Sequence, residues 1–285
     1  MAFPMIDQPA GNLVITPAGL TVLNSEAAAP YLQPTDRQLF YEVVRLVEGL
    51  PLFWDDHVRR LQTSVAEQFT IDPDRLLNDS LKLVQAAGQE FSQANLRIVV
   101  TENDFVIHLS PSYYPTPEQF ACGVPTAYLQ RERLNPNIKT VDAAYKAAVA
   151  EGFAQERPGG RPFELLLVNS EGMITEGSRS NVFFIQGNKI ITAPAELILL
   201  GITRYHVVDA IKATGAELVT GLVSTAQIAA GEVEAAFLTG SPIDILPISR
   251  IEDTQLESAG QPLIKAVHDA YQAIVRADLE QRRLK

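Results

Sequence analysis

Cysteine is almost absent from this chain of 285 residues, which contains only Cys122. A single cysteine cannot form a disulfide within the chain, and this usage fits a reducing compartment. No apolar run reaches the roughly 18–20 residues that span a bilayer. The first residues also lack the basic segment and apolar segment of a secretory signal. These absences predict a soluble cytoplasmic protein without a membrane partner.

Positive charge is also scarce, with 23 Lys and Arg against 34 Asp and Glu and a net charge of −11. A nucleic-acid binder neutralises phosphates with clustered Lys and Arg, so no nucleic-acid partner is expected. The sequence has no GxGxxG, P-loop, GxSxG or HExxH motif. Its four histidines show no metal-ligand spacing, so no metal site is predicted. Cys122 is interpreted as a buried structural thiol rather than a nucleophile.

Hydrophobic residues make up 46% of the chain, enough for a sizeable core, and their patterns predict an α+β fold. Strands are expected at 39–46, 96–101, 105–109, 124–129, 164–168, 181–185, 189–191 and 235–239, and helices at 57–69, 76–87, 141–152, 203–214 and from 262. Residues 110–120 contain three prolines and are expected to form a loop. We therefore predict two domains, a small N-terminal one over 1–115 and a larger one over 122–285, with a linker at about 110–121.

Two segments have the chemistry of anion sites. The run LGITR (200–204) leads into a predicted helix that Thr203 is expected to cap, where free N–H groups and the helix dipole favour an anion. A strand ending in Thr239-Gly240-Ser241 lets the backbone approach a ligand beside a hydroxyl. Arg60, on the first turns of a helix, is unfavourable to the dipole, which an outside anion could explain. Taken singly, each feature is commoner without a ligand.

In six segments the chain resembles the fold-type IV pyridoxal-phosphate enzymes, the class IV aminotransferases. This family includes branched-chain aminotransferase, D-amino-acid aminotransferase and 4-amino-4-deoxychorismate lyase. The similar segments are FYEVVR (40–45), DDHVRRL (55–61), NIKTVD (137–142), LLLVNSEGMITEGSRSNVFFIQGNKIITAP (165–194), LLGITR (199–204) and FLTGSPIDILPI (237–248). The most specific signal is TEGSxSN followed about 25 residues later by GITR. Together these segments span roughly residues 31 to 250.

The resemblance implies a cofactor, pyridoxal 5'-phosphate, and a role for each matching residue. Lys139 matches the lysine that holds the cofactor as a Schiff base and moves the α-proton, in preference to Lys146. Glu176 matches the carboxylate that faces the pyridine nitrogen. Tyr41 matches an aromatic position on the substrate side. The residues that match the phosphate site are Arg60, Ile202, Thr203 and Ser241.

The resemblance also implies a function and an architecture. We expect an aminotransferase that moves an amino group between an amino acid and a 2-oxo acid, working as a homodimer. The small N-terminal domain is expected to be α/β, and the larger, cofactor-binding domain an α/β pseudo-barrel. A 4-amino-4-deoxychorismate lyase, which eliminates pyruvate and forms 4-aminobenzoate, is the alternative, and a catalytically silent binding protein is the third hypothesis.

The sequence departs from the family at two positions that bear on the site. Arg179 is a bulky addition within TEGSRSN, and the segment 96–109 lacks the arginine that several relatives place just after this strand. The residues that would recognise the substrate therefore match no subfamily.

Overall fold

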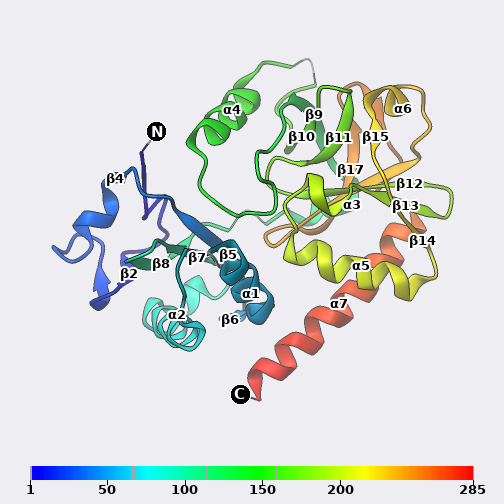
Figure 1. The fold of residues 1–285 in the computed structure, drawn as a ribbon. Coiled ribbons are helices and arrows are strands. Elements are labelled where there is room, and N and C mark those ends of the chain that lie inside the picture. Colours follow the sequence, from blue (N-terminus) through cyan, green and yellow to red (C-terminus); the bar gives the residue numbers. More distant parts are fainter. Residues whose placement is uncertain (1, 66–67, 113, 158, 285) are drawn as a thin grey trace. The chain divides into compact units, whose positions relative to one another are not determined.

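The computed structural model describes residues 2–65, 68–112, 114–157 and 159–284. The chain divides into two compact units, and both are α+β, as predicted (Figure 1). The first unit consists of Met1–Tyr113, Ile138–Ala143 and Ala277–Lys285, and the second of Tyr114–Asn137 and Ala144–Arg276. The domain boundaries given above stay a prediction.

A six-stranded sheet forms the centre of the first unit, in the order β3-β2-β8-β7-β5-β6. Its strands are β2 (Leu13–Thr16), β3 (Gly19–Val22), β5 (Phe40–Val47), β6 (Leu50–Pro51), β7 (Asn95–Val100) and β8 (Phe105–Ser110). Side chains of β5 alternate between buried and half-buried, as the two faces of a pleated strand require. The predicted strands 39–46, 96–101 and 105–109 are thus confirmed, whereas the β2–β3 hairpin was not predicted.

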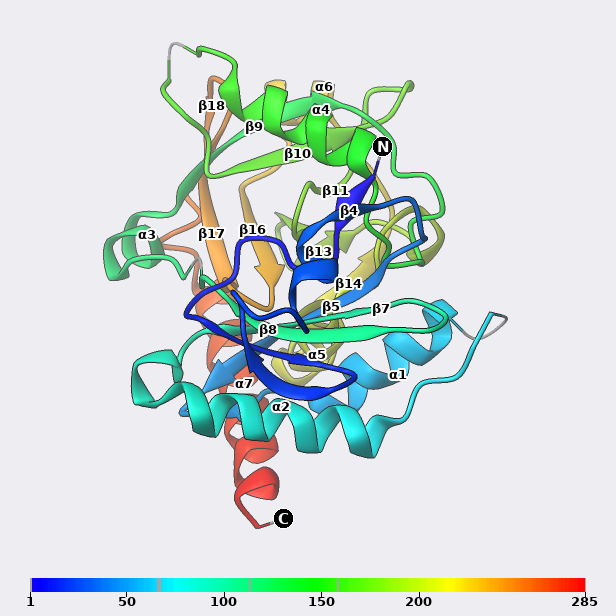
Figure 2. The same ribbon diagram turned by 90° about the vertical axis from the view of Figure 1, so that its left-hand side faces the viewer.

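Helices α1 (Trp54–Val65) and α2 (Pro73–Ala87) pack on one face of this sheet (Figure 2). The carboxylate of Asp72 accepts hydrogen bonds from the first-turn N–H groups of α2 and so begins the helix, which ends before Gly88 at φ 95°. Both helices were predicted; residues 66–67 of the expected helix 57–69 lie outside the described residues. The remaining short elements are β1 (Phe3–Pro4), η1 (Ala29–Leu32), β4 (Pro34–Thr35) and η2 (Gln89–Phe91).

The second unit is built on a ten-stranded mixed sheet that curls, in the order β14-β13-β12-β16-β17-β9-β10-β11-β15, with β18 paired to β17 (Figure 1). Its strands are β9 (Val124–Gln130), β10 (Glu164–Val168), β11 (Met173–Gly177), β12 (Asn181–Gln186), β13 (Lys189–Thr192), β14 (Glu217–Thr220), β15 (Val223–Ser224), β16 (Ala235–Gly240), β17 (Asp244–Ile251) and β18 (Thr254–Gln255). Strand β9 runs parallel to both of its neighbours, and most other pairs are antiparallel. The curled sheet agrees with the pseudo-barrel that the resemblance implied.

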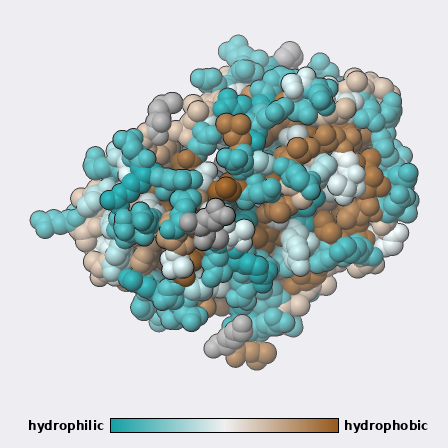
Figure 3. All heavy atoms as spheres, in the orientation of Figure 1, coloured by the Kyte–Doolittle hydropathy of each residue, from teal (hydrophilic) through white to brown (hydrophobic). Residues whose placement is uncertain are grey.

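Five helical segments accompany this sheet: α3 (Pro117–Cys122), α4 (Ala143–Ala154), η3 (Ala195–Leu197), α5 (Ile202–Thr214) and α6 (Thr225–Ala229). Helix α7 (Pro262–Arg283) belongs to this unit as far as Arg276. The rings of Phe183 and Phe237 stack 5.0 Å apart on neighbouring strands of the core. None of the described helices combines the length and apolarity that a bilayer crossing requires. In Figure 3 the visible face carries mostly hydrophilic side chains, and hydrophobic ones gather over the strands of the second unit.

Several local predictions were wrong or incomplete. Helix α3 begins inside the predicted loop 110–120, where Thr116 and Gln119 form a reciprocal capping box that starts a helix. The helix ends at Cys122, whose side chain is exposed and not buried as expected. Thr203 does not cap α5, because the cap residue is Gly201 and the helix begins at Ile202. Strands β11, β14 and β17 were not predicted.

His108 on β8 is fully buried, and its imidazole has one polar contact, from Nδ1 to the carbonyl oxygen of Leu109 at 3.0 Å. Its Nε2 has no partner within the described part of the chain. Burial, helped by the positive charge of Arg97, lowers the pKa of His108 to about 4. The first unit therefore excludes protonated His108.

We expect the first unit to lose stability as the pH falls from about 6.5 towards 4, since the unfolded chain binds a proton on His108 that the folded chain does not. The loss from this group is on the order of 3 kcal/mol. His108→Phe should flatten the dependence in part, because burial also lowers the pKa of His57. Urea unfolding between pH 4.5 and 7.5, followed by the fluorescence of the single Trp54, measures it; equal slopes in both proteins would contradict it.

Candidate active site

A buried carboxylate joins β5 to α1 in the first unit. Glu42 accepts hydrogen bonds from Arg60, at 2.7 Å from Nε and 2.6 Å from Nη2, and contacts Nδ1 of His57 at 2.8 Å. The side chains of Glu42 and His57 are 1% and 2% exposed. From the sequence, an outside anion was one explanation for Arg60 and a solvated side chain the commoner one; in the structure the anion beside it is Glu42, on the neighbouring strand.

The two basic neighbours keep Glu42 ionised. Burial by itself raises the pKa of Glu42, but the charge and hydrogen bonds of Arg60, with the hydrogen bond from His57, outweigh it and lower the pKa to about 2. Burial lowers the pKa of His57, in opposition to Glu42. Neutral His57 then donates its Nδ1–H to the carboxylate, so one negative and one positive charge are matched here.

Lys139 lies beside this cluster, within the same unit. Its carbonyl oxygen accepts a hydrogen bond from the N–H of Tyr41 at 3.1 Å, and its own N–H lies 3.5 Å from Oγ of Ser64 on α1. The Nζ atom sits 4.5 Å from the centre of the Tyr41 ring. Its charge contributes to the lowered pKa of His57. The first unit therefore brings together three predicted residues, Tyr41, Arg60 and Lys139.

A second cation contacts the same tyrosine. Arg97, within β7, has its guanidinium carbon 4.7 Å from the centre of the Tyr41 ring. Its buried Nε has no hydrogen-bond partner among the described residues. From the sequence, an arginine was sought just after this strand, and Arg97 inside the strand was not singled out. A paired strand directs this side chain to the face that carries Tyr41.

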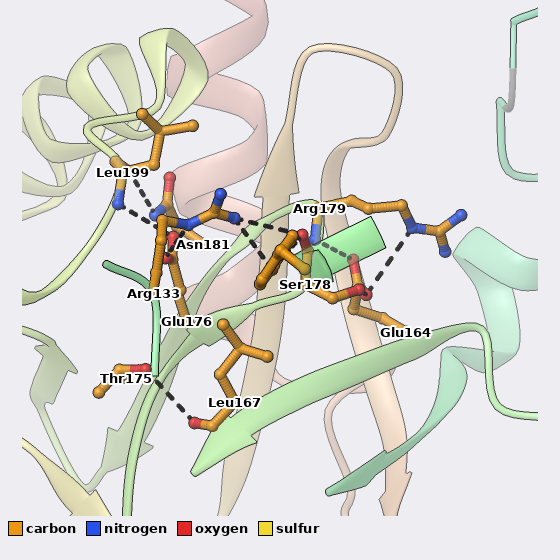
Figure 4. A network of polar contacts seen from close by, with 10 residues as sticks. Arg133, Glu164, Leu167, Thr175, Glu176, Ser178, Arg179, Asn181 and Leu199 are labelled. Carbon is orange, nitrogen blue, oxygen red and sulfur yellow. Dashed lines mark hydrogen bonds and ion pairs between the residues drawn. The ribbon is translucent and has the colours of Figure 1, made fainter. Parts of the chain in front are cut away.

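In the second unit, Glu176 near the end of β11 is a buried carboxylate with both oxygens held (Figure 4). Oε1 accepts a hydrogen bond from Nε of Arg133 at 2.9 Å, and Oε2 accepts one from the N–H of Leu199 at 3.1 Å. The side-chain N–H of Asn181 in turn donates a hydrogen bond to the Leu199 carbonyl oxygen at 2.9 Å, which holds Leu199 in place. An arginine contact of this kind favours the ionised carboxylate.

Arg133 and Tyr145 meet on the turn that follows Glu176. Tyr145 on α4 donates to the carbonyl oxygen of Ser178 at 2.8 Å, and Nη2 of Arg133 lies 3.0 Å from the Tyr145 hydroxyl. The guanidinium also stacks 4.3 Å from the centre of the tyrosine ring. Arg179, the addition in TEGSRSN, extends away from these groups, donates to the Phe163 carbonyl and lies over the Phe153 ring (Figure 4).

The start of α5 is built for close approach of another group. Gly201 caps the helix without a side-chain hydrogen bond, and a Cβ there would lie 2.3 Å from Oδ1 of Asn181. Only glycine fits without displacing Asn181. Ile202 and Thr203 follow, both buried, in the first turn, where the N–H groups of a helix point outward.

The loop between β16 and β17 lies at the same end of the sheet. Thr239 pairs with Asn181 in the antiparallel β12–β16 register, and Gly240-Ser241 follow it. The Oγ1 atom of Thr239 is fully buried and lacks a partner among the residues that the structure describes. The second unit thus collects Glu176, Ile202, Thr203 and Ser241 around the ends of β11, β12 and β16.

The residues that hydrogen-bond to the predicted site residues were not predicted from the sequence. Glu42 follows Tyr41 directly, and His57 stands three positions before Arg60 in the quoted DDHVRRL segment, so both were adjacent to recognised residues. Arg133 had a weaker signal, two arginines in the run Arg131–Arg133 shortly before Lys139. The pairing of Arg133 with Glu176 cannot be read from spacing alone, because 43 residues separate the two.

Comparison with known proteins places these residues in a family. Residues 39–251 match the model of the amino-transferase class IV family. D-alanine aminotransferase of Bacillus licheniformis is 27% identical over 257 residues, which cover 81% of this chain and 86% of the relative. Aminodeoxychorismate lyase of Bacillus subtilis is 24% identical over 278 residues, or 86% of this chain and 90% of the relative.

Among solved structures, the PLP-bound form of a hypothetical aminotransferase from Mycobacterium tuberculosis superposes with a TM-score of 0.76 at 17% identity, covering 93% of this chain and 99% of that one. This likeness confirms the fold. Because the family model matches most of the chain, the protein belongs to the class IV aminotransferases.

We expect Glu42→Gln to destabilise the first unit by about 3 kcal/mol, because Arg60 would lose its charged partner in a buried place. The double variant Glu42→Gln/Arg60→Met should lose less than the sum of the two single changes. Urea unfolding followed by Trp54 fluorescence provides the cycle. Additive losses would show that the pair contributes no coupling.

Proposed function

We propose that this chain is a pyridoxal-phosphate-dependent aminotransferase that moves an amino group between an amino acid and a 2-oxo acid. The observation that carries the proposal is the buried carboxylate of Glu176, fixed through both oxygens within the segment most typical of the family. Such a carboxylate suits a protonated ring nitrogen. We also propose that the protein works as a homodimer, as the resemblance implies, and that it does so in the cytoplasm, in keeping with its single cysteine.

The residues of the second unit fit a phosphate group. The first turn of α5 has no side-chain cap, which leaves backbone N–H groups and the helix dipole for an anion. The unpartnered Oγ1 of Thr239 and the neighbouring Gly240 mark the adjacent loop as suited to a polar ligand. We assign the phosphate to Ile202, Thr203 and Ser241, together with Arg60.

Pyridoxal phosphate, when bound, supplies an electron sink for the carbanion formed at the substrate Cα. The chain's own groups do the rest. Lys139 would hold the cofactor through its Nζ and, once freed by the incoming amino group, would take the proton from the substrate Cα as a base and deliver it to the cofactor as an acid. Glu176 keeps the proton on the ring nitrogen, and Arg133 keeps Glu176 negatively charged for that purpose.

Tyr41 and Arg97 are proposed for the substrate side. The ring of Tyr41 contacts the cations of both Lys139 and Arg97, so these groups share one face of β5 and β7. An arginine with an unpartnered buried Nε suits a carboxylate, which both an amino acid and a 2-oxo acid carry. Arg97 is therefore our candidate for the substrate carboxylate.

Lys139→Ala should remove the visible absorption band that the purified protein shows with pyridoxal phosphate and that borohydride alters. Activity should fall by at least about 100-fold, because the nucleophile and base are the same group. Lys146→Ala, on α4, is the matched control and should keep the band. A wild-type protein that takes up no cofactor would overturn the proposal, and a band lost only in Lys146→Ala would reassign the lysine.

The reaction type is tested with a panel of L- and D-amino donors against several 2-oxo acids. A transaminase consumes the donor only when an acceptor is present, so product should depend on both. Release of pyruvate from aminodeoxychorismate without any acceptor would instead identify a lyase. Arg97→Lys should raise KM more than it lowers kcat, because a point charge replaces a bidentate donor.

A further inference from the structure

Glu164, the first residue of β10, is a buried carboxylate to which the proposed function gives no role. Its side chain is 2% exposed, and every other residue of its strand is apolar. An ionised carboxylate in such a place requires hydrogen bonds to both oxygens. The donors that supply them show what it holds.

Three consecutive residues of one turn donate to Glu164 (Figure 4). The hydroxyl of Ser178 donates to Oε1 at 2.6 Å, the hydroxyl of Ser180 to Oε2 at 3.0 Å, and the N–H of Arg179 to Oε2 at 3.3 Å. The N–H of Leu165 completes Oε1 at 2.8 Å. The guanidinium of Arg179 adds a longer ion pair, with its Nε at 3.8 Å.

The same turn follows Glu176 after a single residue, Gly177. The N–H of Gly177 donates to the Ser180 carbonyl at 2.8 Å and closes the turn. A Cβ on Gly177 would lie 2.1 Å from Oγ of Ser180 and 3.1 Å from Cγ of Glu164. The backbone at Gly177 therefore packs directly against the Glu164 side chain, and this contact restricts how far Glu164 and Glu176 can move relative to each other.

Ser178 links the two carboxylates. Its hydroxyl is committed to Glu164, while its carbonyl oxygen accepts from Tyr145 at 2.8 Å and from Nη2 of Arg133 at 3.4 Å. Arg133 is the residue that holds Oε1 of Glu176. Figure 4 shows Glu164 and Arg133 on either side of Ser178.

We propose that Glu164 is a positioning residue: it fixes the turn 177–181 and, through Ser178 and Arg133, aims the carboxylate of Glu176. This inference rests on the proposed function, in which Glu176 faces the ring nitrogen of the cofactor. It also assigns the hydroxyls of Ser178 and Ser180 to the turn, as donors to Glu164. The phosphate is left to other groups.

The test uses the full chain reconstituted with pyridoxal phosphate. Glu164→Gln keeps the shape but replaces one acceptor oxygen by an N–H group, which opposes the N–H of Arg179. We expect cofactor affinity to fall about 10-fold, the usual scale for a residue that orients a ligand. The pH titration of the visible band should shift in the same direction as in Glu176→Gln, because both variants weaken the partner of the ring nitrogen.

Two further variants provide a control for Glu164→Gln and a second test of its role. Glu252→Gln is the matched control, a carboxylate of the same unit that accepts a backbone N–H, from Tyr128 at 2.6 Å, away from the turn; it should leave the band and its titration unchanged. Ser178→Ala removes only the hydroxyl link and decides the question if Glu164→Gln does not fold.

A purely structural role would lower the melting temperature of Glu164→Gln or Ser178→Ala and leave affinity and band titration as in the wild type, and this result overturns the inference. A wild-type protein without cofactor overturns the proposed function and the inference with it. A wild-type band that responds to Glu176→Gln, but not to Glu164→Gln or Ser178→Ala, overturns the inference alone.

Discussion

A carboxylate can be buried only where donors replace its water, and three such groups organise this protein. Glu42, Glu164 and Glu176 are each at most 3% exposed, and each is held by hydrogen bonds to both oxygens. Their partners come from other elements of the fold: α1 for Glu42, the β11–β12 turn for Glu164, and the segments of Arg133 and Leu199 for Glu176. Because removing one partner leaves a charge without compensation, each carboxylate fixes the relative placement of the elements that it joins.

The apolar strands of the second unit keep water away from its buried polar contacts. Strands β10, β12 and β16 are buried along nearly their whole length, so water does not compete with the polar contacts at their ends. The ends of the strands are where the chain can change from a regular ladder to a turn, and Gly177 and Gly240 stand at these changes. Polar chemistry therefore gathers at one end of a rigid apolar sheet, a placement that keeps functional groups in fixed geometry.

Much of the fold follows from periodicity, because strands with a clear apolar pattern and helices with capping residues were found close to their predicted bounds. The failures have local causes. Strand β11 (Met173–Gly177) mixes polar and apolar residues and ends in a Glu-Gly pair that resembles a turn, while its burial comes from neighbours elsewhere in the chain. The capping box at Thr116 was hidden by prolines, although proline fits the first turn of a helix. Thr203 looked like a cap, but Gly201 takes that place because Asn181 leaves no room for a side chain.

The candidate site divides in the same way. A family motif identifies Glu176 or Lys139, yet it gives no account of what holds them, since Arg133 reaches Glu176 from 43 residues away. The dipole argument about Arg60 suggested an outside anion, whereas Glu42 of the same unit provides one at short range. Since Glu42 offsets the charge of Arg60, an anion near this pair would be selected by directed N–H groups more than by net charge. The start of α5 would select an anion in the same way, through the partial positive charges on its backbone N–H groups. In both units the geometry of these N–H groups, more than net charge, would therefore decide which anion binds.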